Sequence, residues 1–305
     1  MSRQVRCLHH MSARAIRVTI AWMPTTRAAD GRTETEQLAA EAILFHYTSA
    51  EALIQIVKSG VLWASNINYL NDGSEFLHAL AVADDVLQQI ERRRRGAPLI
   101  KALRAVLTPV RRANTFVLSF SGASDLLSQW RAYCPASRGV AIGISLQRLR
   151  SVAASQGFAL TPCIYDLSDQ EAVVESILRE LFRKFDAGPK RRDVAFWADE
   201  FASRFRIHAP AFKHSSFREE REWRLVSDEL AVNDPGIRFR QGSSFVVPYV
   251  EFDIPRADGE LQFDAFVVGP TPHSELAQQS MRSLLEVHRC RWRYLVPSQV
   301  PYRPW

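Results

Sequence analysis

The chain has 305 residues, of which 47% are hydrophobic and seven are tryptophan, so it can bury a substantial core and is not a disordered chain. The formal net charge of +6 is compatible with a polyanionic partner without requiring one. No apolar run approaches the roughly 20 residues that span a bilayer, so we expect no membrane partner. The four cysteines lie far apart without CxxC spacing, which indicates neither a metal site nor a disulfide framework and favours a cytoplasmic protein.

The first 40 residues differ in character from the rest. They carry scattered arginines and end in a polar stretch, and their one apolar piece, Ile16–Trp22, is too short for a secretory signal. We therefore expect residues 1–40 to form a basic, flexible extension and residues 41–305 to form a single domain.

The first predicted elements follow one another closely. Ile43–Thr48 has the composition of a strand. Ser49 stands where a helix N-cap is expected, and Gly60 stands where the same helix should end, because glycine suits a left-handed C-terminal position. Strands and helices are expected next at Val61–Ala64 and Glu75–Ile90, with a loop, Asn66–Gly73, between them.

The remaining elements mix strands and helices without regular βαβ alternation, which favours an α+β fold. Strands are expected at Thr115–Phe120, Gly139–Ser145, Cys163–Tyr165, Arg221–Val226, Arg238–Arg240, Phe245–Val250, Ala265–Gly269 and Arg291–Tyr294. Helices are expected from Ser145 to Ala154 and at Gln170–Phe185, Val194–His208 and Ser274–Val287. The second and third of these helices form a helical insertion at about residues 168–210.

Two short motifs carry candidate binding residues. Because alternate side chains of a strand share a face, His46 and Thr48 should point together, away from Phe45 and Tyr47. Such a pair can recognise an amide or a sugar hydroxyl. The alternative, which the residues alone favour, is a core histidine bonded to a neighbouring carbonyl. Further along, Ser119-Phe-Ser121 and Gln129-Trp-Arg131 form a second motif.

A third motif, Glu220-Arg-Glu222-Trp-Arg224, contains the best catalytic candidates. At the entry to a strand, Glu220 and Glu222 should face the same way. Two carboxylates on one face repel each other unless a ligand or a cation uses them. The alternative is a solvated charge run, because residues 218–222 also fit a series of surface ion pairs. The apolar strand that follows favours Glu222, held near the core, as the essential acid.

Together these motifs, with Gly60-Val-Leu-Trp63 and Asn71-Asp72, resemble a bacterial family called domain of unknown function 2971, over about residues 43–285. They also resemble, more distantly, ADP-ribosyltransferases, in which a first-strand histidine, central aromatics and a late glutamate bind NAD⁺. This resemblance implies a split β core with flanking helices.

The same resemblance implies roles for individual residues. His46 and Thr48 would hold NAD⁺, and Glu222 would drive its cleavage, with Glu220 completing an acidic pair. The aromatic partner of nicotinamide would be one of Trp63, Tyr69, Trp130 and Tyr133, with Tyr69 and Trp63 preferred. Arg131 suits a diphosphate, because its planar fork donates two parallel bonds, or it is a surface arginine. Ser121 would hold a ribose, or simply end its strand.

The resulting hypothesis is an NAD-dependent ADP-ribosyltransferase that uses NAD as substrate and modifies a nucleic acid or a protein, with a toxin or phage-defence effector as its expected setting. The alternative is a non-catalytic nucleic-acid-binding or sensor module on the same scaffold. That alternative depends on the basic clusters Arg92–Arg95, Arg111–Arg112 and Lys190–Arg192. The sequence indicates neither the acceptor nor the oligomeric state.

Overall fold

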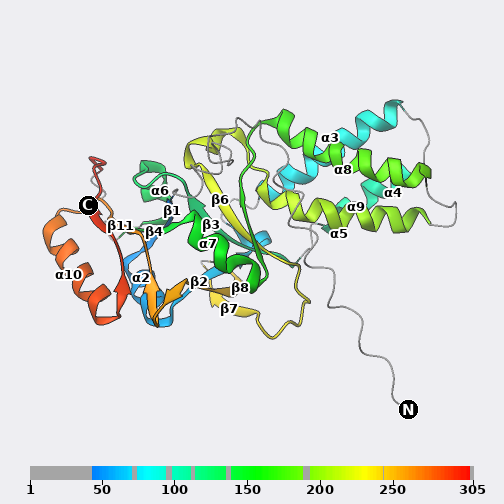
Figure 1. Ribbon diagram of the computed structural model, residues 1–305. Coiled ribbons are helices and arrows are strands. Elements are labelled where there is room, and N and C mark those ends of the chain that lie inside the picture. The colour runs from blue at the N-terminus through cyan, green and yellow to red at the C-terminus, as the bar shows by residue number, and fades with distance from the viewer. Residues whose placement is uncertain are drawn as a thin grey trace, which may run out of the picture.

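The computed structural model describes residues 43–70, 74–93, 98–110, 114–134, 139–187, 193–242 and 244–302 (Figure 1). The extension expected at residues 1–40 lies outside these ranges. The expected α+β class is confirmed, because helices pack on both faces of a mixed sheet that does not follow a βαβ order. No helix within the described ranges is both long enough and apolar enough to cross a membrane.

Ten strands of the described chain form one sheet, in the order β13-β11-β4-β1-β3-β2-β8-β7, with β6 joining β3 and β5 joining β6. Its strands are β1 (Ile43–Ser49), β2 (Val61–Asn66), β3 (Phe116–Ser121), β4 (Gly139–Ser145), β5 (Phe158–Pro162), β6 (Glu222–Ser227), β7 (Arg238–Gln241), β8 (Val246–Asp253), β11 (Ala265–Val268) and β13 (Tyr294–Pro297). The short strands β9 (Arg256–Ala257), β10 (Glu260–Gln262) and β12 (Cys290–Arg291) form a second, three-stranded sheet.

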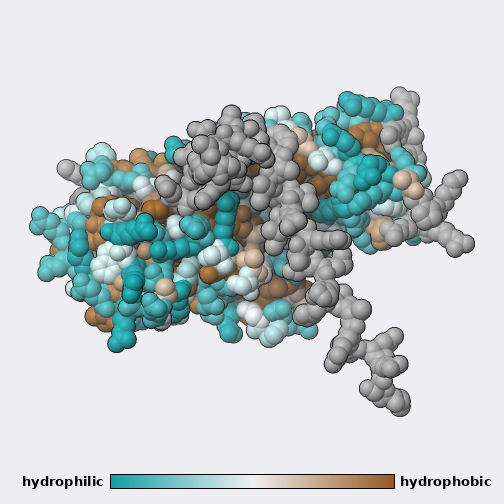
Figure 2. All heavy atoms as spheres, in the orientation of Figure 1, coloured by the Kyte–Doolittle hydropathy of each residue, from teal (hydrophilic) through white to brown (hydrophobic). Residues whose placement is uncertain are grey.

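One face of the large sheet, here called the first face, carries Leu44, Leu118 and Leu225. It is covered by α2 (Ala50–Ser59), α7 (Leu146–Ala153) and α10 (Ser274–Val287), whose apolar side chains share its core. Polar residues dominate the solvent side of α10 (Figure 2), as an amphipathic helix requires.

The opposite face, here called the second face, has a different cover. Above β3 and β6 lies a helical layer, which appears at the upper right of Figure 1. It consists of α3 (Ser74–Arg93), α4 (Pro98–Ala105), α5 (Leu107–Val110), α8 (Leu167–Ala187) and α9 (Val194–His208). Val117 and Val226 pack into this layer, whereas Trp130 of α6 (Leu127–Tyr133) covers β1, β4 and β11. The predicted helical insertion thus packs together with α3 and α4.

The sequence predicted helix ends correctly where a capping residue marks them. The Ser49 hydroxyl accepts the amide hydrogen of Ala52, and Gly60 ends α2 in the left-handed region with φ of 74°. Ser145 caps α7 in the same manner, by accepting from the Arg148 amide.

Several expectations need correction. The strand expected at Cys163–Tyr165 lies earlier, at β5, and Ile164 makes only an isolated bridge to Phe212. The strand expected at Arg291–Tyr294 is two separate strands, β12 and β13. Helices α4 and α6 were not expected; α6 begins without a side-chain cap, so its start carries no sequence signal.

The pairing around β3 positions the candidate site. β3 pairs with β6 along its length, but its other edge is shared by two strands. β1 meets it only at Phe45↔Ser121, and β2 only at its beginning, through Ser65↔Val117 and Asn66↔Phe116. β1 and β2 therefore diverge along β3.

Candidate functional site

The three sequence motifs meet in one row across adjacent strands. Phe45 of β1 is the cross-strand partner of Ser121 of β3, and Ser121 is the partner of Glu222 of β6. Directly opposed residues in antiparallel strands project on the same side of a sheet. Segments about 75 and 100 residues apart in sequence thus converge on the second face.

His46 faces the other way. It follows Phe45 in the strand, so its side chain projects on the first face, where its ring lies 5.9 Å from that of Phe120. Its Nδ1 donates to the Ser119 carbonyl at 3.1 Å. Burial lowers the pKa of His46, more than this hydrogen bond raises it, so the ring is neutral near pH 7.

The roles expected for His46 and Glu222 require both side chains to reach one pocket, and the structure contradicts this requirement. The sheet lies between them, because the register through Ser121 places Glu222 on the second face. Thr48 shares the first face with His46, and its carbonyl accepts from the Cys134 thiol at 3.4 Å. The alternative interpretation of His46, a core histidine bonded to a carbonyl, describes its contacts.

Tyr47, between these two residues, reaches the convergence point instead. Its hydroxyl donates to the Ala123 carbonyl at 2.8 Å and accepts the Leu126 amide hydrogen at 3.0 Å. Its ring packs edge-on against Trp130, with centroids 4.6 Å apart. Tyr47 therefore holds the loop that connects β3 to α6.

The same loop is held at two more points. The Ser121 hydroxyl donates to the Glu220 carbonyl at 2.6 Å and accepts the Ala123 amide hydrogen at 3.0 Å. Since Ser121 is also buried, these contacts favour its role as a strand end over a contact with ribose. The Asp125 carboxylate accepts hydrogen bonds from three donors, which are the Trp130 indole, the Ser298 hydroxyl and the Gln299 backbone N–H.

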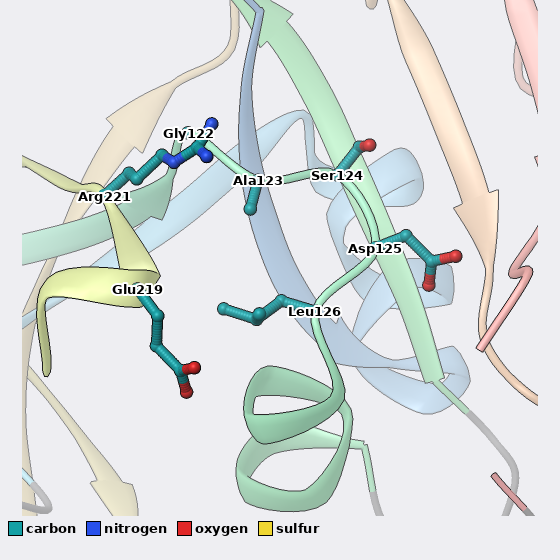
Figure 3. A pocket seen from close by; sticks show the side chains of 7 residues that line it. All are labelled: Gly122, Ala123, Ser124, Asp125, Leu126, Glu219 and Arg221. Carbon is teal, nitrogen blue, oxygen red and sulfur yellow. The ribbon is translucent and has the colours of Figure 1, made fainter. Parts of the chain in front are cut away.

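A cavity of about 430 Å³ opens beside this loop. It is lined by Gly122, Ala123, Ser124, Asp125, Leu126, Glu219 and Arg221. Figure 3 shows Arg221 extending toward Gly122 and Ala123, Glu219 pointing toward the side of Leu126, and the Asp125 carboxylate turned away. The cavity thus has a basic end and an acidic end.

Glu222 itself belongs to a buried ion cluster, so it is not part of a solvated charge run. Arg224 donates to both carboxylate oxygens of Glu222, from Nε at 2.8 Å and from Nη2 at 3.0 Å. The Lys213 ammonium lies 2.7 Å from Glu222 and 2.9 Å from Glu220. Two acids and two bases form a cluster that is neutral overall.

The charge state of Glu222 follows from these contacts. Its burial would raise its pKa, but the Arg224 guanidinium and the Lys213 ammonium outweigh burial and lower the pKa to about 2. The carboxylate is therefore ionised across the physiological range and is no proton donor there.

The cluster also connects the sheet to the helical layer. Lys213 follows η5 (Ala209–Ala211), the short helix after α9, and its carbonyl accepts from the buried Gln170 side chain of α8 at 2.9 Å. Arg224 donates to the Pro210 carbonyl at 2.7 Å. The Glu222 amide donates to the Tyr165 hydroxyl at 2.8 Å. Glu222 is therefore fixed from several sides.

The aromatic candidates do not gather at the cavity. Trp63 packs against Tyr249 with ring centroids 4.4 Å apart and planes tilted by 30°. Tyr69 packs edge-on against Phe245 with centroids 5.6 Å apart, and both pairs lie beside β2 and β8. β2 pairs with the start of β3, about 15 Å along an extended strand from Ser121. Both residues are partly exposed, whereas Trp130 is buried under the loop.

Arg131 lies on α6, with its guanidinium 5.2 Å from the ring centre of Tyr302. It is exposed and does not line the cavity. Of the basic clusters, Arg92 and Arg93 are exposed at the end of α3. The remainder, residues 94–95, 111–112 and 190–192, lie outside the described residues.

Sequence reasoning missed Tyr47, Lys213 and Arg221 as parts of this region. Tyr47 could have been found, because strand alternation already placed it opposite His46. Lys213 carried no signal, since only the fold brings it to the acidic pair. In the described ranges no group of three or more His, Cys, Asp or Glu side chains is arranged to hold a metal.

Residues 129–225 match the model of a protein family described as a protein of unknown function (DUF2971). The matched segment begins in α6 and ends in β6, and so includes Gln129-Trp-Arg131 and the Glu220–Arg224 motif. The match supports the resemblance to that family over this segment. A search of curated proteins found no match.

Proposed function

We propose that this chain is an NAD-dependent ADP-ribosyltransferase whose reactive site lies where β3 meets β6. The observation that carries the proposal is the row Phe45–Ser121–Glu222, which assembles the three motifs on adjacent strands. The divergence of β1 and β2 along β3 is compatible with a split β core.

The proposed reaction breaks the bond between C1′ of the nicotinamide ribose and the ring nitrogen. The bonding electron pair moves to the nicotinamide, which leaves as a neutral molecule, and an oxocarbenium ion develops on the sugar. A nucleophile of the acceptor then forms a bond to C1′ and loses a proton. An ionised carboxylate held in place stabilises the developing positive charge, and preorganised electrostatics of this kind is often the largest catalytic contribution.

The low pKa of Glu222 suits this electrostatic role and excludes it as a general acid at neutral pH. Glu220 is the more accessible of the two acids, with 15% of its side chain exposed compared with 6% for Glu222. The proposal therefore keeps Glu222 as the charge that supports cleavage, and it assigns to Glu220 the contact with the acceptor.

In this proposal NAD⁺ occupies the cavity beside the β3–α6 loop, and the first-face pair His46 and Thr48 takes no direct part. Neither Glu220 nor Glu222 lines the cavity as it stands, so productive binding requires the sugar to reach past Glu219 toward the ion cluster. A macromolecular acceptor, in a toxin or phage-defence setting in the cytoplasm, remains part of the proposal.

The test is transfer of label from NAD⁺. The full chain is incubated with adenine-labelled NAD⁺ and cell lysate, and the products are divided between nuclease and protease treatment. Label that survives one treatment and is lost in the other supports the proposal and identifies the acceptor class. The absence of both transfer and nicotinamide release contradicts it and favours the non-catalytic nucleic-acid-binding or sensor alternative.

A further inference from the structure

Arg221 occupies a backbone conformation that suits glycine. It follows η6 (Ser215–Glu220) with φ of 46° and ψ of 47°, in the left-handed region. Its carbonyl accepts the Gly122 amide hydrogen at 2.9 Å, which ties it to the β3–α6 loop. A Cβ on Gly122 would lie 3.1 Å from the Arg221 Cβ, so glycine there permits this close approach. A position where glycine would be relaxed instead carries a guanidinium at the cavity wall.

Arg221 also differs from its basic neighbours in its partners. Between residues 213 and 224 the sequence has Lys213, Arg218, Arg221 and Arg224. Lys213 and Arg224 pair with Glu222, and Arg218 pairs with Asp166. Arg221 makes no side-chain hydrogen bond or ion pair with any residue in the described ranges. Its planar fork is therefore free for a ligand at the cavity.

From this geometry we infer that Arg221 binds a phosphate group of a nucleoside diphosphate at the basic end of the cavity. The opposite end presents the Glu219 carboxylate, an acceptor suited to ribose hydroxyls. The two ends together fit a ligand with a phosphate at one end and a sugar at the other. This inference rests on the proposed function for its choice of ligand, and it gives Arg221 the phosphate contact that Arg131 was expected to make.

The substitution Arg221→Gly removes the guanidinium without adding strain to the backbone. Glycine accepts the left-handed conformation, so the melting temperature of the variant should not fall below that of the wild type. Affinity for ADP-ribose, ADP and inorganic pyrophosphate should fall by about tenfold to a hundredfold, the range for one charge-assisted hydrogen bond. Affinity for adenosine, which has no phosphate, should stay the same.

Two variants serve as matched controls. Arg218→Gln removes a charge from η6, the short helix that precedes Arg221, but that charge pairs with Asp166 away from the cavity lining. Arg131→Gln tests the arginine expected from the sequence. Both should keep wild-type affinity for ADP-ribose in isothermal titration calorimetry.

The outcomes separate this inference from the proposed function. If wild-type protein releases nicotinamide but Arg221→Gly keeps its ADP-ribose affinity, the phosphate site is wrong and the proposed function stands. If ADP and pyrophosphate bind through Arg221 without nicotinamide release, the phosphate site stands and the proposed function is wrong. Equal losses in Arg131→Gln or Arg218→Gln, or no binding of any probe to the wild type, would overturn the phosphate site.

Discussion

The Lys213 ammonium lies 2.7 Å from the Glu222 carboxylate, and both side chains are almost completely buried. Lys213 comes from the segment after α9, and Glu222 begins β6, so this contact joins the helical layer to the sheet at the point where the motifs converge. Buried charges are tolerated only when they are paired, so each partner depends on the other.

This dependence predicts a large stability effect for Glu222→Gln. The substitution leaves Lys213 and Arg224 with less compensating charge in a buried site, and breaking a buried pair costs about 3–5 kcal/mol. Glu229→Gln is a matched control, because Glu229 pairs with Arg206 at the surface, where such pairs contribute about 0–1 kcal/mol. Urea unfolding of both variants measures the difference. Equal, small losses would show that the buried cluster contributes little.

The pH dependence of stability follows from the same carboxylate. The pKa of Glu222 falls from 4.5 to about 2 on folding, so the unfolded chain binds the proton more readily. The contribution of Glu222 is therefore complete above about pH 4.5 and is lost as the pH falls toward 2. Unfolding free energies measured across this window should decrease less steeply for Glu222→Gln than for the wild type. Parallel curves would contradict the assignment.

A third prediction concerns the loop beside the cavity. Tyr47→Phe removes the bonds to Ala123 and Leu126 but keeps the ring against Trp130, so it should cost about 1–3 kcal/mol. ADP-ribose affinity should fall as well, because the loop forms the cavity wall. Tyr249→Phe is the control, since the described residues offer its hydroxyl no hydrogen bond. If both variants bind ADP-ribose as the wild type does, Tyr47 does not position the site.

A substitution at His46 tests whether this residue binds NAD⁺, as the resemblance implies, or has the structural role that its position indicates. If His46 held NAD⁺, His46→Gln would weaken NAD⁺ binding and slow nicotinamide release. Its position on the first face predicts instead a loss of stability, from the lost Ser119 bond and the contact with Phe120, and unchanged NAD⁺ binding in the folded fraction. Calorimetric titration with NAD⁺ decides between the two. A large loss of affinity would restore the role implied by the resemblance.

The sequence was informative where the cause is local. Ser49 and Gly60 bound α2 through a cap and a left-handed turn, and both are visible in a short window. Strand alternation correctly separated His46 from Tyr47. Alternation does not give the register between β1, β3 and β6. This register decides whether His46 or Tyr47 lies on the same side of the sheet as Glu222. The helix α6 was missed because its N-cap residue, Leu126, has no side chain that can cap a helix.

The burial of Glu222 is a second feature that the local sequence pattern does not predict. The run Arg218–Glu222 fits a surface charge pattern, and Arg218 does form an exposed pair with Asp166. Only two residues of the motif, Glu222 and Arg224, are deeply buried, because the neighbouring strands and Lys213 enclose them. Those neighbours are distant in sequence, so the pattern could suggest paired carboxylates but not the cation between them.

The most direct measurement is nicotinamide release from NAD⁺ by the wild type, Glu222→Gln and Glu229→Gln, under conditions where calorimetry shows each protein to be folded. The proposed role of Glu222 predicts turnover by the wild type and by Glu229→Gln, and a loss of about two to three orders of magnitude in folded Glu222→Gln, with NAD⁺ affinity changed much less. Wild-type turnover in folded Glu222→Gln, or no turnover by any of the three, would contradict it.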